Sequence, residues 1–318
     1  MSPNIRLGLI GAGKWGENYI KTIESIKNIE LIRIACKSSI SDKRIIFPSH
    51  SFTENWEEVV SSKEIDGIII ATPPKMHFEI ASECIKNRKP LIVEKPFTLC
   101  LKDAEYLMLL AEKYKTIVKI NHIYLYHPVF RLLKKEISKK SNLRSIYSVS
   151  GNFGPFRKDV SPLWDWGPHD VAMCLAIINK FPYKIESRYL KNDISSLNHK
   201  SNINIKLHFG KGIYADLNFG NYMKSKNRHL KVNFEDSSLI FDPIHYSNIQ
   251  KEINEKINDY IYDKSNIHSD FDLSPLELLL KEFVADILSS NFNLSDLLLS
   301  KDVISILESV DQKLKKSF

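Results

Sequence analysis

The 318-residue sequence predicts an α/β protein, and three observations support this fold class. Short β-branched apolar runs alternate with helical patterns in the first part of the chain. A glycine-rich turn follows the first of these runs, and strands that alternate polar with apolar residues dominate the remainder. Strand–helix alternation is typical of a parallel sheet covered by helices on both faces. The length suits two domains that each bury a core.

The first five predicted strands are nearly continuous in apolar residues, as expected of parallel strands buried on both faces. They lie at residues 5–10, 30–36, 66–72, 90–95 and 116–121. Between them, apolar residues three and four positions apart predict helices, at 75–88 and 100–114 among others.

The first strand leads into the turn GAGKWG, which fits G-x-G-x-x-G between a strand and a helix. Gly11 permits the tight turn, Gly13 lets a pyrophosphate approach the backbone, and Gly16 lets the helix pack closely. Unpaired N–H groups at the helix N-terminus then face the phosphates. The pattern predicts a Rossmann domain that binds a dinucleotide; a glycine turn without a ligand is the alternative.

The end of the second strand reads CKSS and lacks the carboxylate that binds the ribose 2′-hydroxyl of NAD. Lys37 and the hydroxyls of Ser38 and Ser39 could bind a 2′-phosphate instead. We therefore expect NADP(H) to be favoured over NAD(H). The alternative is a solvated Lys37 in an enzyme that uses NAD.

Several segments together resemble the Gfo/Idh/MocA family of sugar and inositol oxidoreductases, over nearly the whole chain. They are GAGKWG (11–16), ATPPKMHFEIA (71–81), EKP (94–96), DWGPH (165–169) and the helical stretch 275–291. The resemblance implies an N-terminal Rossmann parallel sheet and a C-terminal α/β domain with a large, mostly antiparallel sheet. We place the dinucleotide-binding domain at 1–122 and the substrate-binding and oligomerisation domain at 123–318.

The second part of the chain agrees with a sheet that has one covered face, because its predicted strands alternate polar and apolar residues. These strands lie at 144–153, 203–209, 212–219, 229–235 and 238–242, and FGKG between two of them predicts a hairpin turn. In the family this sheet commonly forms the subunit interface, which implies a homodimer or homotetramer.

The resemblance places Lys95 of the EKP motif beside the nicotinamide and the reacting carbon. A lysine at the carboxyl end of a parallel strand points into the crevice where such sheets bind ligands. The alternative is a surface lysine neutralised by Glu94. The resemblance also implies that Glu94 bonds the nicotinamide ribose and that a cis peptide bond precedes Pro96.

The family pattern D-x-G-x-H is supplied by Asp165, Gly167 and His169. At positions i and i+4 of a helix, Asp165 and His169 share a face and can hydrogen-bond. A carboxylate that fixes the tautomer of an imidazole suits general acid/base catalysis. The sequence therefore predicts a proton-transfer pair here.

Two departures from the family pattern lie within this segment. With Pro168 present, the helix either begins near Ser161–Pro162 and contains the proline, or begins at Pro168 itself. The later aspartate of the family is Ala172 here, and the role is not transferred to Asp170, which would point elsewhere.

The candidate site residues fall into three groups. The candidate catalytic residues are Lys95, Asp165 and His169. The candidate cofactor-binding residues are Gly11, Ala12, Gly13, Lys14, Trp15, Gly16, Lys37, Ser38, Ala71, Thr72, Pro73, His77, Glu94, Lys95 and Asn121. The candidate substrate-binding residues are Lys95, Tyr124, Arg157, Trp164, Asp165 and His169. No metal is expected, because zinc needs three or four converging ligands and the sequence has no H-E-x-x-H motif or cysteine cluster to complete such a set.

The expected function is that of an NAD(P)-dependent dehydrogenase or reductase acting on CH–OH groups. A hydride would pass between the nicotinamide and a carbon of a sugar, nucleotide sugar or inositol, in carbohydrate biosynthesis for example. Whether Lys95 or His169 is the main acid/base stays open. The alternatives are a non-sugar substrate, such as a dihydrodiol or a bilin-like ring, and a non-catalytic NADP-sensing regulator.

Composition argues against several other classes of protein. The net charge of +7 is spread along helices, and we interpret the short basic runs as solvated faces and not as a nucleic-acid site. Four scattered cysteines are typical of a reducing compartment. No signal peptide or bilayer-spanning run is apparent. We expect a cytoplasmic protein with a small-molecule substrate and no membrane partner.

Overall fold

The computed structural model describes residues 4–37, 40–193, 200–260 and 269–316. The chain divides into two compact units, each built from two segments. The first unit consists of Met1–Asn121 and Leu276–Lys301, and the second of His122–Pro275 and Asp302–Phe318. These units differ from the functional domains expected at 1–122 and 123–318, because Leu276–Lys301 belongs to the first unit. The assignment of dinucleotide binding to 1–122 and of substrate binding to 123–318 stays a prediction.

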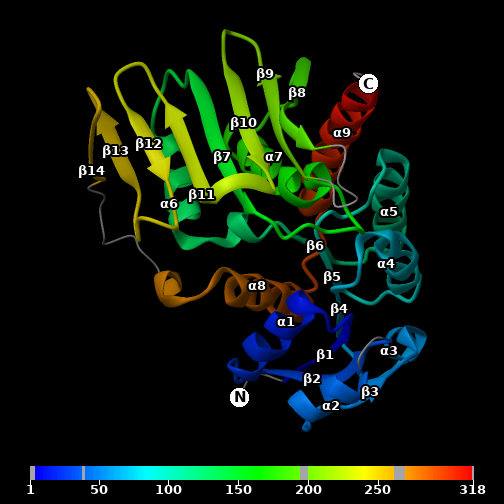
Figure 1. Cartoon of the computed structure of the whole chain (residues 1–318). Coiled ribbons are helices and arrows are strands. Elements are labelled where there is room, and N and C mark those ends of the chain that lie inside the picture. The colour runs from blue at the N-terminus through cyan, green and yellow to red at the C-terminus, as the bar shows by residue number, and fades with distance from the viewer. Residues whose placement is uncertain (1–3, 38–39, 194–199, 261–268, 317–318) are drawn as a thin grey trace. The chain divides into compact units, whose positions relative to one another are not determined.

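The first unit contains a six-stranded sheet in which every strand pairing is parallel (Figure 1). Its strands are β1 (Ile5–Ile10), β2 (Ile29–Ala35), β3 (Phe52–Thr53), β4 (Gly67–Ile70), β5 (Leu91–Glu94) and β6 (Val118–Asn121). Their order is β3-β2-β1-β4-β5-β6, so the connections reverse direction between β1 and β4. Ligands bind at such a switch point, beyond the carboxyl ends of the strands.

The helices of the first unit include those predicted at 75–88 and 100–114. They are α1 (Lys14–Glu24), α2 (Ile40–Ile46), α3 (Trp56–Ser61), η1 (Pro74–Met76), α4 (His77–Lys86), α5 (Leu101–Tyr114) and α8 (Pro275–Ser289). Helix α8 confirms the predicted helix at 275–291 and packs directly on β4. A Cβ atom added to Gly67 would lie 3.0 Å from side-chain atoms of both Phe283 and Ile287.

The second unit contains an eight-stranded sheet, in which only the pairing of β7 with β10 is parallel. Its strands are β7 (Ser145–Phe153), β8 (Lys184–Asp193), β9 (Lys200–His208), β10 (Tyr214–Gly220), β11 (Tyr222–Asn233), β12 (Ser238–Phe241), β13 (Gln250–Ile253) and β14 (Lys256–Asp259). Their order is β14-β13-β12-β11-β7-β10-β9-β8. Together the two sheets confirm the predicted fold class.

The predicted FGKG turn joins β9 to β10. The Phe209 N–H donates to the Ile213 carbonyl at 2.9 Å, and Gly210 and Gly212 have φ angles of +82° and +75°. Strands β8, β13 and β14 were not predicted, because few of their residues form apolar runs. Strands β13 and β14, at one end of the sheet, are largely exposed or half-buried.

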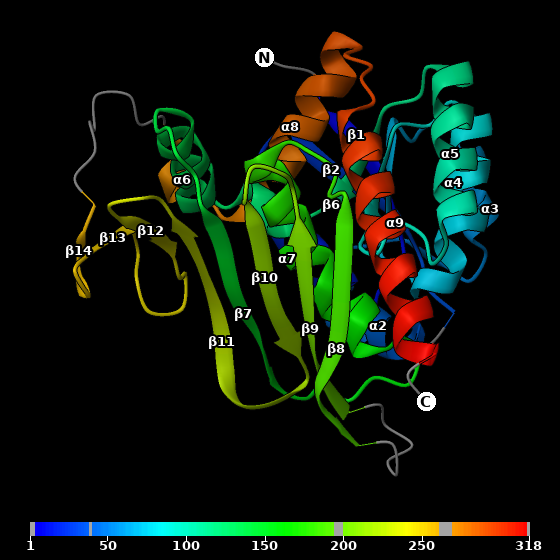
Figure 2. The same cartoon turned by 90° about the horizontal axis from the view of Figure 1, so that it is seen from above.

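Helices α6 (Pro128–Ser138) and α7 (Pro162–Ile178) lie on one face of the second sheet (Figure 2). Helix α7 contacts β7, β9 and β10, and α6 contacts β12. Along β11, Arg228, Leu230 and Val232 are buried, while the residues between them are half-buried. This alternation identifies the inward-facing side of the strand. The remaining elements are η2 (Ile123–Tyr126), η4 (Ser269–Asp272) and α9 (Ser295–Lys316).

The packing of α8 on β4 makes a prediction about stability. Phe283 is completely buried, so Phe283→Ala should lower the free energy of unfolding by about 3–5 kcal/mol, as other buried Phe→Ala changes do. On the same helix, Leu288 is 49% exposed, and Leu288→Ala should change the free energy of unfolding by less than about 0.5 kcal/mol. Urea denaturation measures both. Equal losses in the two variants would show that α8 is not anchored through Phe283.

Candidate active site

The glycine turn after β1 forms part of a cavity of about 330 Å³ in the first unit. Of the predicted cofactor-binding residues, seven line it: Gly11, Ala12, Gly13, Lys37, Ala71, Thr72 and Pro73. The other lining residues, which sequence reasoning missed, are Ile10, Ala35, Cys36, Glu54, Trp56 and Met76. The cavity therefore spans the carboxyl ends of β1 and β4, at the topological switch point of the sheet.

Each glycine of the turn meets a separate steric requirement. Gly11 has a φ of +100°, and a Cβ on it would lie 2.6 Å from the Ala71 carbonyl group. A Cβ on Gly16 would lie 2.1 Å from the Gly11 carbonyl oxygen. At Gly13, by contrast, an added Cβ would have no heavy atom within 4 Å. A side chain is thus excluded by backbone at Gly11 and Gly16, whereas Gly13 faces open space.

The open space at Gly13 fits the pyrophosphate of a dinucleotide. Gly13 is the N-cap of α1 and provides no side-chain acceptor for the first N–H groups of that helix. These groups, together with the helix dipole, favour an anion at this position. The predicted residues Lys14 and Trp15 begin α1 and do not line the cavity, and Ser38 lies outside the described residues.

Two charged side chains of opposite sign line the same cavity. Lys37 follows β2 directly, and Glu54 lies between β3 and α3. Both are exposed. The cationic group was predicted from the sequence, whereas the carboxylate was not, because it comes from a different strand end.

At the carboxyl ends of β5 and β6, Glu94 and Asn121 form a buried hydrogen-bonded group with Tyr19 of α1. The Glu94 carboxylate accepts from Asn121 Nδ2 at 2.6 Å and from the Tyr19 hydroxyl at 3.0 Å. Asn121 also donates to the Tyr19 oxygen at 2.9 Å. Burial raises the pKa of Glu94, against the effect of the two donors. The structure thus brings two predicted cofactor residues together with Tyr19, which sequence reasoning missed.

Lys95 follows β5 and is half-buried, and the peptide bond to Pro96 is cis. The buried imidazole of His77 lies between the loop that follows β4 and the loop that follows β5. Its Nδ1 is 2.9 Å from the Pro96 carbonyl oxygen, and its Nε2 is 2.9 Å from that of Thr72. His77 does not line the cavity, and instead connects the loop after β4 to the loop that carries Lys95.

Helix α7 begins at Pro162 and contains Pro168, which decides between the two helix starts considered above. Asp165 lies in its first turn and accepts from Arg157 Nη1 at 3.1 Å. Arg157 also donates to both carboxylate oxygens of Asp159, at 3.0 and 2.6 Å, and this pairing raises the pKa of the guanidinium. The charge of Arg157 is therefore already compensated by two carboxylates.

The other predicted residues of α7 are buried, and His169 contacts Tyr124. The two rings meet edge to face, with centroids 5.1 Å apart and an interplanar angle of 88°. Tyr124 comes from η2, so two predicted substrate-binding residues from separate elements lie together. Trp164 is also buried in this helix. The hydrogen bond expected between Asp165 and His169 stays a prediction.

Asp170 faces the sheet of the second unit. Its carboxylate accepts a hydrogen bond from Ser150 of β7 and lies 3.4 Å from Arg228 Nη1 of β11. Burial raises the pKa of Asp170, and the nearby guanidinium opposes this shift. Arg228 was missed in the sequence, although a charged residue in phase with Leu230 and Val232 was a usable signal.

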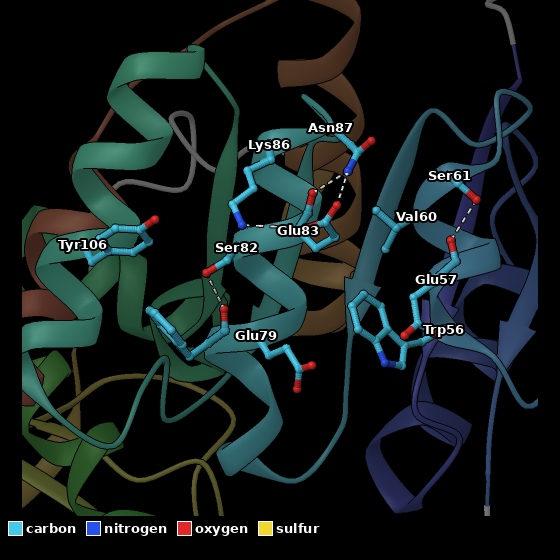
Figure 3. Close-up of a pocket in the computed structure, with 11 residues that line it drawn as sticks. Trp56, Glu57, Val60, Ser61, Glu79, Ser82, Glu83, Lys86, Asn87 and Tyr106 are labelled. Atoms are coloured by element: carbon cyan, nitrogen blue, oxygen red, sulfur yellow. Dashed lines mark hydrogen bonds and ion pairs between the residues drawn. The ribbon is translucent and has the colours of Figure 1, made fainter.

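A second cavity, of about 570 Å³, lies against α3, α4 and α5 (Figure 3). Trp56 lines both cavities, but no predicted site residue lines this one. Among its polar groups, Glu83 pairs with Lys86 and accepts from Asn87. The hydroxyls of Ser61 and Ser82 donate to backbone carbonyl groups. We assign this cavity no role in the site.

Neither a metal centre nor a membrane span is found within residues 4–37, 40–193, 200–260 and 269–316. No three His, Cys, Asp or Glu side chains there are grouped so as to hold a metal ion. None of the helices in these ranges combines the length and the apolar character that crossing a bilayer requires.

Comparison with known proteins agrees with this geometry. Residues 5–122 match the model of an oxidoreductase family with an NAD-binding Rossmann fold. The scyllo-inositol 2-dehydrogenase (NADP(+)) of Bacillus subtilis is 22% identical over 250 residues, which cover 74% of this chain and 68% of that protein. Over residues 5–122 this chain matches the Gfo/Idh/MocA family of oxidoreductases.

Other relatives match different shares of the chain. The rhizopine catabolism protein MocA of Rhizobium meliloti is 26% identical over 145 residues, and the match spans under half of either chain, 46% of this one and 45% of that protein. A crystal structure from Magnetospirillum magnetotacticum, classed as an oxidoreductase, is 29% identical with a TM-score of 0.85. It covers 96% of this chain and 99% of its own, so the likeness in fold includes both units.

The steric difference between Gly13 and Gly16 makes a prediction about cofactor binding. Gly13→Ala should weaken NAD(P)H binding by about tenfold or more, because its methyl group enters the space for the pyrophosphate. Its free energy of unfolding should change by less than about 0.5 kcal/mol. Gly16→Ala should lower both the affinity for NAD(P)H and the free energy of unfolding, because its Cβ would meet the Gly11 backbone. Fluorescence titration and urea denaturation provide the two readouts, and unchanged binding by Gly13→Ala would contradict the placement of the pyrophosphate.

The burial of His77 makes a prediction about pH. Burial lowers the pKa of this imidazole below its ordinary value of 6.5, so the unfolded chain takes up the proton first on acidification. The free energy of unfolding contributed by His77 is therefore fully present above about pH 6.5 and is lost as the pH falls below it. A His77→Gln variant should show a shallower loss between pH 7 and pH 5.5 in urea denaturation. Parallel curves for the two proteins would contradict a neutral, buried His77.

Proposed function

We propose that the chain is an NAD(P)-dependent dehydrogenase or reductase that acts on a sugar, nucleotide sugar or inositol. A hydride passes between the nicotinamide and the carbon that carries the hydroxyl or keto group. The observation that carries this proposal is the arrangement of the first unit. A glycine cradle that fits a dinucleotide lies at the switch point, and Lys95 follows the neighbouring strand β5.

The roles of the side chains follow from their chemistry and from the family resemblance. When bound, the nicotinamide supplies the hydride acceptor or donor. Lys95 and His169 exchange the proton of the substrate hydroxyl, since an ammonium or imidazolium can donate it and the neutral forms can accept it. Asp165 orients this group through its carboxylate. The Glu94–Asn121–Tyr19 group holds the end of β5, and therefore the backbone before Lys95, in place.

The substrate class is proposed from the names of the relatives and from the family. The Bacillus subtilis relative is named for its action on scyllo-inositol with NADP(+), and the rhizobial relative for rhizopine catabolism. Scyllo-inositol is a cyclic polyol, and its hydroxyl groups suit the proposed proton-transfer group. Biosynthesis of an unusual sugar or a polysaccharide is the setting we propose for this reaction.

We further propose a cytoplasmic homodimer or homotetramer without nucleic-acid or membrane partners. The face of the second sheet opposite α6 and α7 supports the oligomer. It carries exposed aromatic residues, including Tyr147 of β7 and Tyr214 of β10, and aromatic residues are enriched at subunit interfaces.

For the cofactor we propose a preference for NADP(H), based on Lys37 at the end of β2 and on the absence of a carboxylate there. Glu54 lines the same cavity and would repel a 2′-phosphate.

The two charges should therefore act in opposite directions on cofactor choice. Lys37→Gln should lower the ratio of kcat/KM for NADPH over NADH by about tenfold, the effect of losing one charge-assisted contact of about 1.4 kcal/mol. Glu54→Gln should raise the same ratio. Steady-state kinetics with both cofactors measures it. Equal ratios in wild type and Lys37→Gln would refute the assignment of Lys37.

The role of Lys95 tests the enzymatic function itself. With a substrate from a panel of inositols, sugar phosphates and nucleotide sugars, Lys95→Met should lower kcat by about 10²–10⁴-fold, the usual contribution of a general acid/base. Its affinity for NADPH should stay near that of wild type. Lys86→Met is the matched control, because Lys86 pairs with Glu83 on the exposed side of α4. Turnover by Lys95→Met equal to that of the control would exclude Lys95 from catalysis.

A further inference from the structure

We propose that Arg228 is a positioning residue of the active site. Anchored by Asp170, it holds the ring of Tyr124 and, through that ring, the imidazole of His169. This inference rests on the proposed function, in which His169 exchanges the substrate proton. All four residues belong to the second unit, and they come from β11, α7 and η2.

The starting observation is a buried ion pair with little evident benefit for stability. The side chains of Arg228 and Asp170 are 7% and 1% exposed, and their closest charged atoms are 3.4 Å apart. Removing two charges from water can cost more than their attraction returns, and apolar residues often replace buried pairs without loss of stability. A pair of this kind next to candidate catalytic residues therefore calls for a role other than stability.

The aromatic neighbours of Arg228 indicate that role. Its Cζ lies 4.2 Å from the centroid of the Tyr124 ring and 5.6 Å from that of Trp166. A guanidinium is planar and rigid, stacks on aromatic faces, and keeps its N–H donors at its edge. Asp170 contacts one nitrogen of the guanidinium, so this group lies between the carboxylate and the ring of Tyr124.

Tyr124 passes this constraint to His169. Its ring meets the imidazole edge to face at 5.1 Å, the arrangement that aromatic pairs prefer. Asp170 and His169 are adjacent on α7, yet one faces the sheet and the other the tyrosine. The same turn of α7 therefore carries both His169 and Asp170. Asp170 contacts Arg228, and Arg228 contacts the ring of Tyr124 that lies against His169.

The expected effect is on the chemical step and not on cofactor affinity. A misplacement of about 1 Å in a reacting group can reduce the rate about 10²-fold. Arg228→Met, which keeps the length of the side chain but not its charge or plane, should therefore lower kcat by about that factor. KM for the panel substrate and the Kd for NADPH should remain near their wild-type values.

Two further variants keep the test valid if Arg228→Met does not fold. Arg228→Lys preserves a cation beside Asp170 but has no planar group to stack, so it should fold and lose about tenfold in kcat. The double variant Arg228→Met with Asp170→Asn leaves no unpaired buried charge and should remain as slow as the single variant. The matched control is Arg144→Met, because Arg144 pairs with Glu235 on the surface of the same unit.

A direct readout of ring position does not depend on turnover. The ring resonances of His169 in a ¹³C-histidine-labelled protein, assigned by their loss in His169→Asn, should move in Arg228→Met and Arg228→Lys. Those of His50 and His77, in the first unit, should stay in place. If no panel substrate is turned over, the proposed function fails, whereas these resonances still test the positioning of His169.

Two results would overturn the proposal. One is wild-type kcat in folded Arg228→Lys and in the double variant, together with unmoved His169 resonances. The other is a raised KM confined to substrates that carry a phosphate or carboxylate, with kcat and the resonances unchanged. That second result would make Arg228 a direct contact of the substrate.

Discussion

The close approach of backbone segments at the ends of β1 and β4 is the constraint on which the first unit depends. Neither Gly11 nor Gly16 has room for a Cβ, because the carbonyl groups of Ala71 and Gly11 occupy that space. This contact brings the start of α1 to the switch point of the sheet and leaves open space at Gly13. The cavity, with Lys37 and Glu54 in its lining, lies at this point, and Lys95 follows the nearby strand β5.

Two buried carboxylates, Glu94 and Asp170, connect elements that are distant in the sequence, because their hydrogen-bond partners come from other helices and strands. In the first unit, Glu94 is bonded by Tyr19 and Asn121, which joins α1, β5 and β6. In the second, Asp170 is bonded by Ser150 and faces Arg228, which joins α7, β7 and β11. Because unpaired buried groups are costly, these sets fix side-chain positions around the candidate catalytic residues more firmly than apolar packing would.

Local patterns predicted the features that depend on neighbouring residues. The glycine turn, the parallel strands and the hairpin before Ile213 all have signals within a few positions, whereas the start of the helix near Pro168 stayed open between two alternatives. What the sequence did not reveal depends on register between distant segments. Tyr19 meets Glu94 only through the packing of α1 on the sheet, and Arg228 meets Asp170 only through the pairing of β11 with β7. Strands β13 and β14 lacked a signal because they have little apolar surface to bury.

The most direct test of the central claim is the transfer of a labelled hydride. Purified protein is incubated with NADPH deuterated at C4 of the nicotinamide and with the oxidised forms of the panel sugars and inositols. Mass spectrometry and NMR of the product should then find deuterium on the carbon that becomes the carbinol. Tight binding of NADPH without deuterium in any product would contradict an oxidoreductase and would favour a protein that only senses the dinucleotide.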